Sequence, residues 1–227
     1  MLASLTTLTL LALASASPLK RTTTTTSPAL SRAKAYNLQV QLLDPSKDLT
    51  PSIAGHYIGT AHVGAGQNIA IIGSATDAGA APFYTNGTSD AAASDVLNDL
   101  GTSFPWGINV LAKDASDATY PGEHGVSVNV GGGSLGVGVV RQGGGNDAGS
   151  VVLGGPAPGG WAACERFVGY TRSNMTVVRY VYEGESAPAD CVGISFRPLC
   201  AALPDLPAGS EWTHEFVQEV DCVVPAQ

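Results

Sequence analysis

The chain has 227 residues and a formal charge of −8, and only 13% of its residues are charged, against 28 glycines and 14 prolines. This length suits one domain with a sizeable core, and the many turn-forming residues argue against a helical protein. An acidic surface repels nucleic acid and anionic membranes, so we exclude a nucleic-acid partner.

Residues 1–16 have the pattern of a secretory signal peptide, because the apolar run Leu8–Leu13 precedes the small residues Ala14-Ser15-Ala16. Residues 17–34 form a Ser/Thr-rich propeptide or spacer that contains the dibasic pair Lys20-Arg21. No later apolar stretch is long enough to cross a bilayer. We therefore expect a secreted, extracellular protein without a membrane span.

Period-two alternation predicts a strand over Tyr36–Leu42. The segment Gly55–Thr88 predicts a strand, a turn at Gly64 and Gly66, a buried strand at Ile69–Ile72 and a short strand at Phe83–Thr88. One short helix is expected over Ser89–Leu100, since Asp90 suits its N-terminal cap and Gly101 its C-terminal cap.

The second half of the chain continues in short alternating segments. Val126–Val130 and Leu135–Val139 flank a run of glycines and predict a hairpin. Further strands are expected at Ile108–Leu111, Ser150–Leu153, Trp161–Tyr170, Thr176–Tyr182 and Val192–Phe196. About nine or ten short strands are typical of a sandwich or a barrel.

The fold class predicted is therefore all-β: a single-domain antiparallel sandwich of jelly-roll type over residues 35–200, with the short helix and a disulfide-tied C-terminal tail over residues 201–227. In this tail Trp212, Phe216 and Val220 are spaced four residues apart, which predicts a packed helical turn or two.

The four cysteines are Cys164, Cys191, Cys200 and Cys222, and in a secreted chain an even number indicates disulfides with three possible connectivities. We favour Cys164–Cys191 with Cys200–Cys222, because the second bond would attach the tail to the last strand. No two cysteines have zinc-cluster spacing, so no metal site is expected from them. Asn86 and Asn174 are N-glycosylation acceptors.

Several segments together resemble a family of small secreted proteins of filamentous ascomycete fungi that has no assigned activity. They are Tyr57–Ile72 with His62-Val63-Gly64-Ala65-Gly66, Phe83–Thr88, Leu100–Gly107, Gly160–Cys164 and the surroundings of Cys191. The resemblance covers roughly Tyr36–Pro198, whereas Asp90–Asp99 looks like an insertion and the cysteine-bearing tail is extra. It implies a secreted fungal protein and the Cys164–Cys191 pair, and it transfers no catalytic residue.

Ser134 lies in Gly132-Gly133-Ser134-Leu135-Gly136, which matches the nucleophile elbow of hydrolases, with Asp190 or Asp205 and His214 in suitable chain order. An elbow needs a helix after the serine, and here a strand with period two follows. The same feature argues against a dinucleotide site at these glycines. A glycine hairpin turn with a solvated serine is the favoured interpretation.

His56 and His62 could suggest a metal ion, but six residues of strand place them ~20 Å apart, so we expect His62 to be hydrogen-bonded beside its turn. Glu183 and Glu185 have the spacing of a carboxylate pair, but the residues that flank them favour a solvated turn. Four aromatic residues are candidates for a sugar-stacking surface, although core packing is the more common role of each: Trp106, Tyr120, Trp161 and Trp212.

The sequence thus leads to a secreted, monomeric, non-catalytic protein that binds a cell-wall or host surface component, with a glycan as one candidate. The alternative is a secreted hydrolase that acts on carbohydrate or ester bonds. We expect no cofactor, no metal and no catalytic residue. A flat, aromatic-lined face would favour the first hypothesis. Ser134 or the Glu183–Glu185 pair in a concave pocket, with a partnering His or acid, would favour the second.

Overall fold

The computed structural model describes residues 29–74, 81–88, 94–115, 119–142 and 150–225. The predicted signal peptide, the Lys20-Arg21 site and most of the predicted spacer lie outside these ranges. Within them the one helical segment is the 3-10 turn η1 (Pro45–Lys47), and no helix there has the length and apolar content that a membrane crossing requires.

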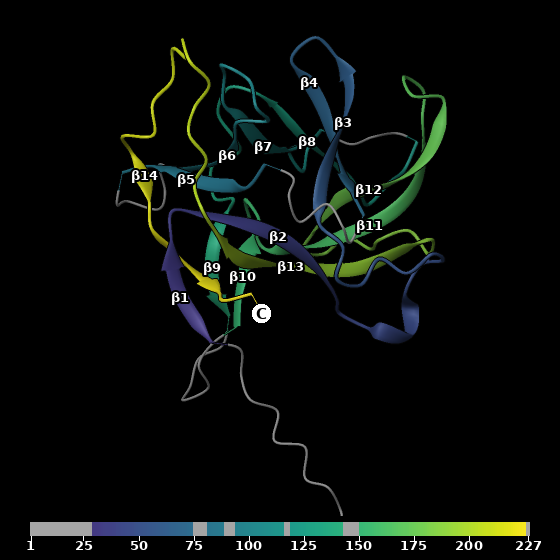
Figure 1. Ribbon diagram of the computed structural model, residues 1–227. Helices are drawn as coiled ribbons and strands as arrows, with labels where there is room; N and C mark the ends of the chain where they lie inside the picture. The colour runs from purple at the N-terminus through teal and green to yellow at the C-terminus, as the bar shows by residue number, and fades with distance from the viewer. Residues whose placement is uncertain (1–28, 75–80, 89–93, 116–118, 143–149, 226–227) are drawn as a thin grey trace, which may run out of the picture.

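Fifteen strands occur in the described residues. They are β1 (Leu30–Ala33), β2 (Ala35–Leu42), β3 (Ile58–Gly64), β4 (Gln67–Ile72), β5 (Phe83–Gly87), β6 (Ser94–Asn98), β7 (Trp106–Val110), β8 (His124–Val130), β9 (Gly138–Gln142), β10 (Ser150–Gly154), β11 (Gly159–Val168), β12 (Ser173–Tyr182), β13 (Cys191–Ala201), β14 (Val217–Gln218) and β15 (Val220–Val223). β9 and β10 form a separate two-stranded ribbon, and the other strands share one sheet (Figure 1).

The large sheet returns on itself. From β2 the antiparallel pairs run through β13, β11, β12, β8, β7, β6 and β5 and back to β2. The one parallel pair among the described strands joins β15 to β13. The predicted all-β, single-domain antiparallel sandwich is confirmed, and its layers are continuous at their edges. The jelly-roll connectivity stays a prediction.

The main core fills the space inside this circuit, and the alternation of apolar residues builds it. In β8 the side chains of Val126 and Val128 face inward, while Ser127 and Asn129 face outward and are only half buried. An edge-to-face row of aromatic rings crosses the centre, with 5.0 Å between the ring centroids of Trp161 and Tyr180. Burying each large apolar side chain stabilises the fold by about 1.5–3 kcal/mol.

The predicted helix over Ser89–Leu100 is wrong for the part that the structure describes. Residues 94–98 form β6, and residues 89–93, with the expected cap Asp90, lie outside the described residues. Val96 belongs to the main core, whereas its neighbour Leu97 belongs to a second cluster on the outer face of the sheet. Only a strand places consecutive residues on opposite faces, so burial in two cores overrides the helical preference of the alanines.

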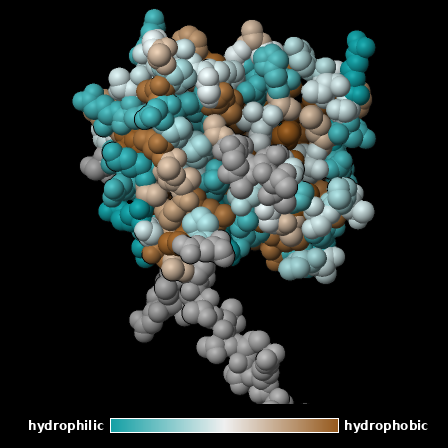
Figure 2. Space-filling view, in the orientation of Figure 1, coloured by the Kyte–Doolittle hydropathy of each residue, from teal (hydrophilic) through white to brown (hydrophobic). Residues whose placement is uncertain are grey.

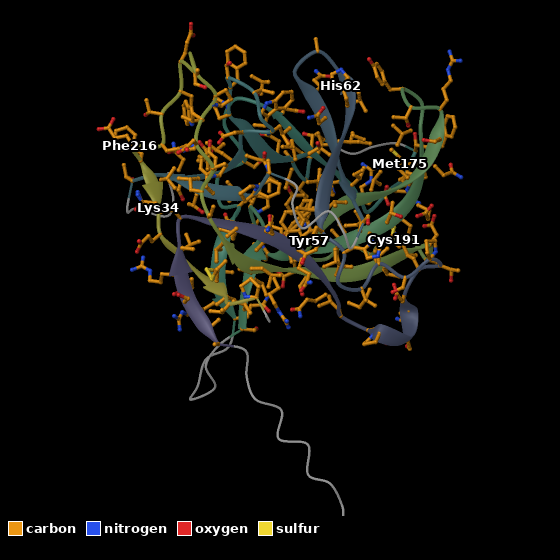
Figure 3. All side chains as sticks on the ribbon, in the orientation of Figure 1. Lys34, Tyr57, His62, Met175, Cys191 and Phe216 are labelled. Carbon is orange, nitrogen blue, oxygen red and sulfur yellow. A yellow bond between two sulfur atoms is a disulfide. The ribbon has the colours of Figure 1, made fainter. Side chains whose placement is uncertain are left out.

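The C-terminal tail is extended rather than helical, so the predicted helical turns are also wrong. β14 pairs with β5, and β15 pairs with β1 and with β13. Trp212 packs with Val217 against Tyr84 in the second cluster, while Phe216 is 56% exposed at the margin of the molecule (Figure 3). An extended backbone lets the tail donate and accept the sheet hydrogen bonds that helical turns would use internally.

The hairpin predicted between Val126–Val130 and Leu135–Val139 does not form, because β9 pairs with β10 instead of β8. The glycine run after β8 passes along β7, where the Ser134 amide donates to the Ile108 carbonyl. A Cβ atom on Gly107 would lie 2.3 Å from the backbone of Gly132, so this close passage requires glycine. In the β3–β4 hairpin, which is confirmed, Gly66 has the positive φ of 68°.

Both predicted disulfides are confirmed. Cys164–Cys191 joins facing residues of β11 and β13, and Cys200–Cys222 attaches β15 to the end of β13. β1 and β15 lie outside the predicted sandwich range 35–200 but pair within the same sheet. The second disulfide therefore fixes a strand that belongs to the sandwich.

Candidate functional site

An open groove of about 440 Å³ lies on the outer face of the sheet, over β4, β7, β8 and β12. We call it the polar groove. Its lining residues are Ile69, Asn109, Val110, Leu111, Ala112, Gly125, Val126, Ser127, Asn129 and Arg179. The strand register sets its centre, because Asn109 of β7 and Ile69 of β4 both face Ser127 of β8. The polar side chains of these strands point outward because their neighbours fill the main core.

Hydrogen bonds to the protein hold the amides of the polar groove in fixed orientations. The Asn109 Nδ2 donates to the carbonyls of Gly107 and Gly132 at 2.9 and 3.2 Å. The Asn129 Nδ2 donates to the Ser127 Oγ at 3.0 Å. These bonds leave the Asn109 Oδ1 as an acceptor and the Ser127 hydroxyl hydrogen as a donor. A ligand that both donates and accepts would therefore meet a preorganised pair.

The end of the groove at Arg179 rests on a buried ionic network. The Glu123 carboxylate receives a bidentate contact from Arg166, at 3.0 and 2.6 Å, and pairs with the Arg179 Nε at 3.0 Å. Arg166 also pairs with Asp190 at 2.6 Å. Two cations and two carboxylates balance, so the network adds no net charge to the groove.

Burial and ion pairing act in opposite directions on Arg166. Burial lowers the pKa of its guanidinium, but the hydrogen bonds and charges of Glu123 and Asp190 outweigh this effect and raise the pKa above its ordinary value. The Tyr120 ring covers the guanidinium, whose central carbon lies 4.2 Å from the ring centroid, and this cation–π contact stabilises the charge further. One face of the Tyr120 ring thus packs on Arg166.

One group of metal-ligand atoms occurs in the described ranges, and its chemistry does not suit an ion. Glu123 lies beside the sulfurs of Cys164 and Cys191, but these sulfurs form a disulfide. Metals bind the thiolate form of cysteine, which a disulfide does not provide. Neither His56 nor His62 belongs to such a group. His56 bonds the Gly73 carbonyl, and His62 bonds the Asn68 side chain beside its turn, as predicted.

Ser134 is half buried, and among the described residues its hydroxyl bonds backbone atoms and no base. Its Oγ accepts from the Val110 amide at 2.9 Å and lies 3.4 Å from the Val110 carbonyl, and the segment that follows is a turn and then β9. The hydroxyl therefore extends the hydrogen bonding of β7. The expectation of a solvated serine is wrong, because the glycine run lies against β7 and does not protrude as a hairpin.

We predict that Ser134→Ala lowers the free energy of unfolding by about 1 kcal/mol, since the amide of the buried Val110 loses its acceptor. For a domain of this size the melting temperature should fall by about 2–4 °C. A serine-directed phosphonate probe should label neither the wild type nor the variant. Stoichiometric labelling of the wild type that the substitution abolishes would show instead that Ser134 is a nucleophile.

His214, which the sequence suggested as a partner for Ser134, holds the C-terminal tail on the sheet. Its Nε2 lies 3.0 Å from the buried Asp99 carboxylate, which also accepts from the Tyr84 hydroxyl at 2.6 Å. Trp212 donates its indole N–H to the same hydroxyl. Burial, followed by the Asp99 contact, raises the pKa of Tyr84 well above its ordinary value. Neither Asp190 nor Asp205 is the partner of His214.

Glu183 and Glu185 lie in the turn after β12 and not on a strand face. The Glu185 carboxylate bonds the buried His124 at 2.9 Å and the Tyr182 amide at 3.2 Å, whereas Glu183 is exposed. Hydrogen bonds within the fold occupy the Glu185 carboxylate, so the two glutamates do not form a catalytic pair across a cleft. The remaining aromatic candidates are packed, with their indole N–H groups bonded to protein: Trp106, Trp161 and Trp212.

The sequence analysis did not select the residues of the polar groove. Ser127 and Asn129 alternate with buried valines, which predicts that they face outward, but their neighbours across the sheet come from distant parts of the chain. Glu123 and Arg166 are separated by 43 residues, and no local pattern joins them. The one available signal of a binding site was the polar outer face of this strand. Many strands at a protein surface have such a face, so it does not by itself indicate a site.

Comparisons with known proteins give a family and one named relative. A family model described as a domain of unknown function, DUF7907, matches residues 33–200, close to the range of the fungal resemblance. A protein named Antigenic protein SchS34, from Stachybotrys chartarum, is 28% identical over 214 residues, which cover 86% of this chain and 88% of that protein. No solved structure matches. The matched range contains every residue of the polar groove.

Proposed function

We propose, from the premise that the chain belongs to the DUF7907 family of unknown function, that it is a secreted, non-catalytic protein that binds an extracellular glycan in the polar groove. The observation that carries this proposal is the fixed acceptor and donor on Asn109 and Ser127, which face each other on neighbouring strands. Side chains at such positions have Cβ atoms about 4.5–5.5 Å apart.

Sugar rings suit this arrangement, because neighbouring hydroxyls on a pyranose both donate and accept hydrogen bonds. Leu111 is 41% exposed on the edge of the groove and offers apolar surface to the C–H groups of a sugar. Among the described residues that line the groove, the one cation is Arg179, and it is paired with Glu123. These features favour a neutral glycan over an acidic one.

Secretion is part of the proposal. Two closed disulfides are typical of proteins from oxidising compartments, and the named relative is called an antigen. The predicted signal peptide over residues 1–16 supplies the route. N-terminal sequencing of material from culture medium should begin at Ser17, or at Thr22 if the Lys20-Arg21 site is cleaved.

The hydrolase hypothesis draws no support from the groups that first suggested it. The Ser134 hydroxyl bonds the backbone of Val110, and Glu185 bonds His124. His214, which belongs to the tail, is held by the Asp99 carboxylate. These three groups are held by separate parts of the fold.

The experiment is a screen of the purified secreted protein on arrays of fungal cell-wall and animal-cell glycans. We expect the protein to be retained on one class of neutral glycan. Its binding signal should change little between about 0.15 M and about 1 M NaCl, because salt screens mainly the contacts between charges. Arrays that retain the protein only on acidic glycans, with loss at high salt, would contradict this choice of ligand. Whether the protein is retained on the fungal cell-wall glycans or on the animal-cell glycans distinguishes a cell-wall component from a host component.

A further inference from the structure

Two aromatic side chains are exposed at the end of the β11–β12 hairpin. Phe167 is 64% exposed, and Tyr170, in the turn, is 62% exposed. This end lies beside the β3–β4 hairpin, because the ring of His62 contacts that of Tyr170 edge-on at 5.6 Å. Figure 3 shows His62 on the β3–β4 hairpin, with Met175 on β12 below it. Exposed apolar groups that gather at one place mark contact surfaces.

The acceptor sequence Asn174-Met175-Thr176 lies on β12 directly opposite Phe167. Phe167 and Asn174 are facing residues in the β11–β12 register, so their side chains leave the same face of the hairpin with Cβ atoms about 4.5–5.5 Å apart. The next pair on this face is Glu165 and Thr176, and here the Thr176 hydroxyl donates to the Glu165 carboxylate. Facing side chains at this end of the hairpin therefore reach each other.

We propose that Asn174 carries an N-linked glycan whose first N-acetylglucosamine packs on the Phe167 ring. The Asn174 Nδ2 attacks C1 of a lipid diphosphate-linked oligosaccharide, so that a C1–N bond forms, the C1–O bond breaks, and the lipid diphosphate and the amide proton leave. The apolar C–H face of the sugar then covers an aromatic face that water otherwise contacts. This inference rests on the secretion in the proposed function but is independent of the polar groove.

The other acceptor, Asn86, has different surroundings. It lies inside β5, between the facing residues Asp95 of β6 and Val217 of β14, and its Oδ1 is buried. The adjacent Gly87 also bonds the tail, through the Phe216 carbonyl and the Gln218 side chain. A glycan at Asn86 would compete with the docking of β14, so we expect folded protein to carry its glycan on Asn174.

The first test is site occupancy. The chain is expressed in a eukaryotic host behind a heterologous signal peptide, so that entry to the secretory pathway does not depend on residues 1–16. Peptide mass spectrometry should find the glycan on Asn174 and not on Asn86, and Asn174→Gln should remove the mass shift. An unmodified Asn174 in secreted, folded protein would overturn the proposal. It would leave the glycan-binding function untouched.

The second test measures the contact with Phe167. Compared with glycosylated wild type, Asn174→Gln should melt about 2–4 °C lower, and protein trimmed enzymatically to one N-acetylglucosamine should keep its melting temperature within about 1 °C. In a Phe167→Ala background the loss of the glycan should change the melting temperature by less than about 1 °C. Phe104→Ala, at a 52% exposed phenylalanine, is the matched control and should retain the full effect. An equal loss in the Phe167→Ala and control backgrounds would refute the stacking.

Discussion

Glu123→Ala is expected to lower the free energy of unfolding by about 3–5 kcal/mol, which is the usual effect of removing one partner from a buried ion pair. The side chains of Glu123 and Arg166 are 1% and 3% exposed, so the substitution leaves the guanidinium in the protein interior without its bidentate partner. Arg179 loses its carboxylate at the same time. Most of the cost therefore comes from the buried charges that remain and less of it from the contact that is lost.

The measurement is urea unfolding monitored by tryptophan fluorescence. The slope of the unfolding free energy against urea concentration is compared between the variants. Glu183→Ala is the matched control, because Glu183 is exposed in the turn after β12, and it should change stability by no more than about 0.5 kcal/mol. Glu123→Gln keeps the shape of the side chain and should still destabilise the fold. A loss below about 1 kcal/mol for Glu123→Ala would mean that water or another group compensates the arginines.

Removal of the Cys164–Cys191 disulfide by Cys164→Ala/Cys191→Ala should cost about 3–5 kcal/mol. The bond closes a loop of 27 residues, for which the chain-entropy estimate is about 3.5 kcal/mol. Cys164 is fully buried, and the Arg166 Nη2 lies 3.2 Å from the Cys191 sulfur. Loss of the bond should therefore also loosen the ionic network.

The Cys200–Cys222 bond provides the comparison, since its 22-residue separation gives nearly the same entropy, about 3.4 kcal/mol. Cys222 is itself part of the main core, so its removal is more costly than the loss of a loose tail would be. We still expect the larger fall in melting temperature for the first bond, because only that bond contacts the buried charges. A larger fall for Cys200→Ala/Cys222→Ala would reverse this order.

The sequence predicts well the strands in which buried and exposed residues alternate, so that one face alone packs in a core. The strand at Tyr36–Leu42 and the hairpin around Gly66 follow from period two and from the turn residues alone. β6 could not be predicted in this way, because Val96 and Leu97 are both buried in different clusters. The partner of β9 also depended on a distant feature, the passage of Gly132 against Gly107.

The candidate site was less predictable than the fold, for a physical reason. A binding face on a sheet is assembled by register, and the register between Asn109 and Ser127 depends on how both strands fit the core. The motifs that can be recognised along the chain, such as the glycines around Ser134, have local spacing but no partner in space. Tertiary contacts with Val110 and with Asp99 determine what Ser134 and His214 do.

The central claim is that the polar groove binds a neutral glycan. The most direct test is titration calorimetry with the glycan to which the protein binds on the arrays. Ser127→Ala removes the donor of the groove and should raise the dissociation constant about 2- to 10-fold, the effect of one neutral hydrogen bond. Ser46→Ala, in the exposed turn η1, is the matched control and should bind as the wild type does. The account predicts loss in the first variant alone. Equal affinities for the wild type and Ser127→Ala, at unchanged stability, would place the binding site elsewhere on the protein.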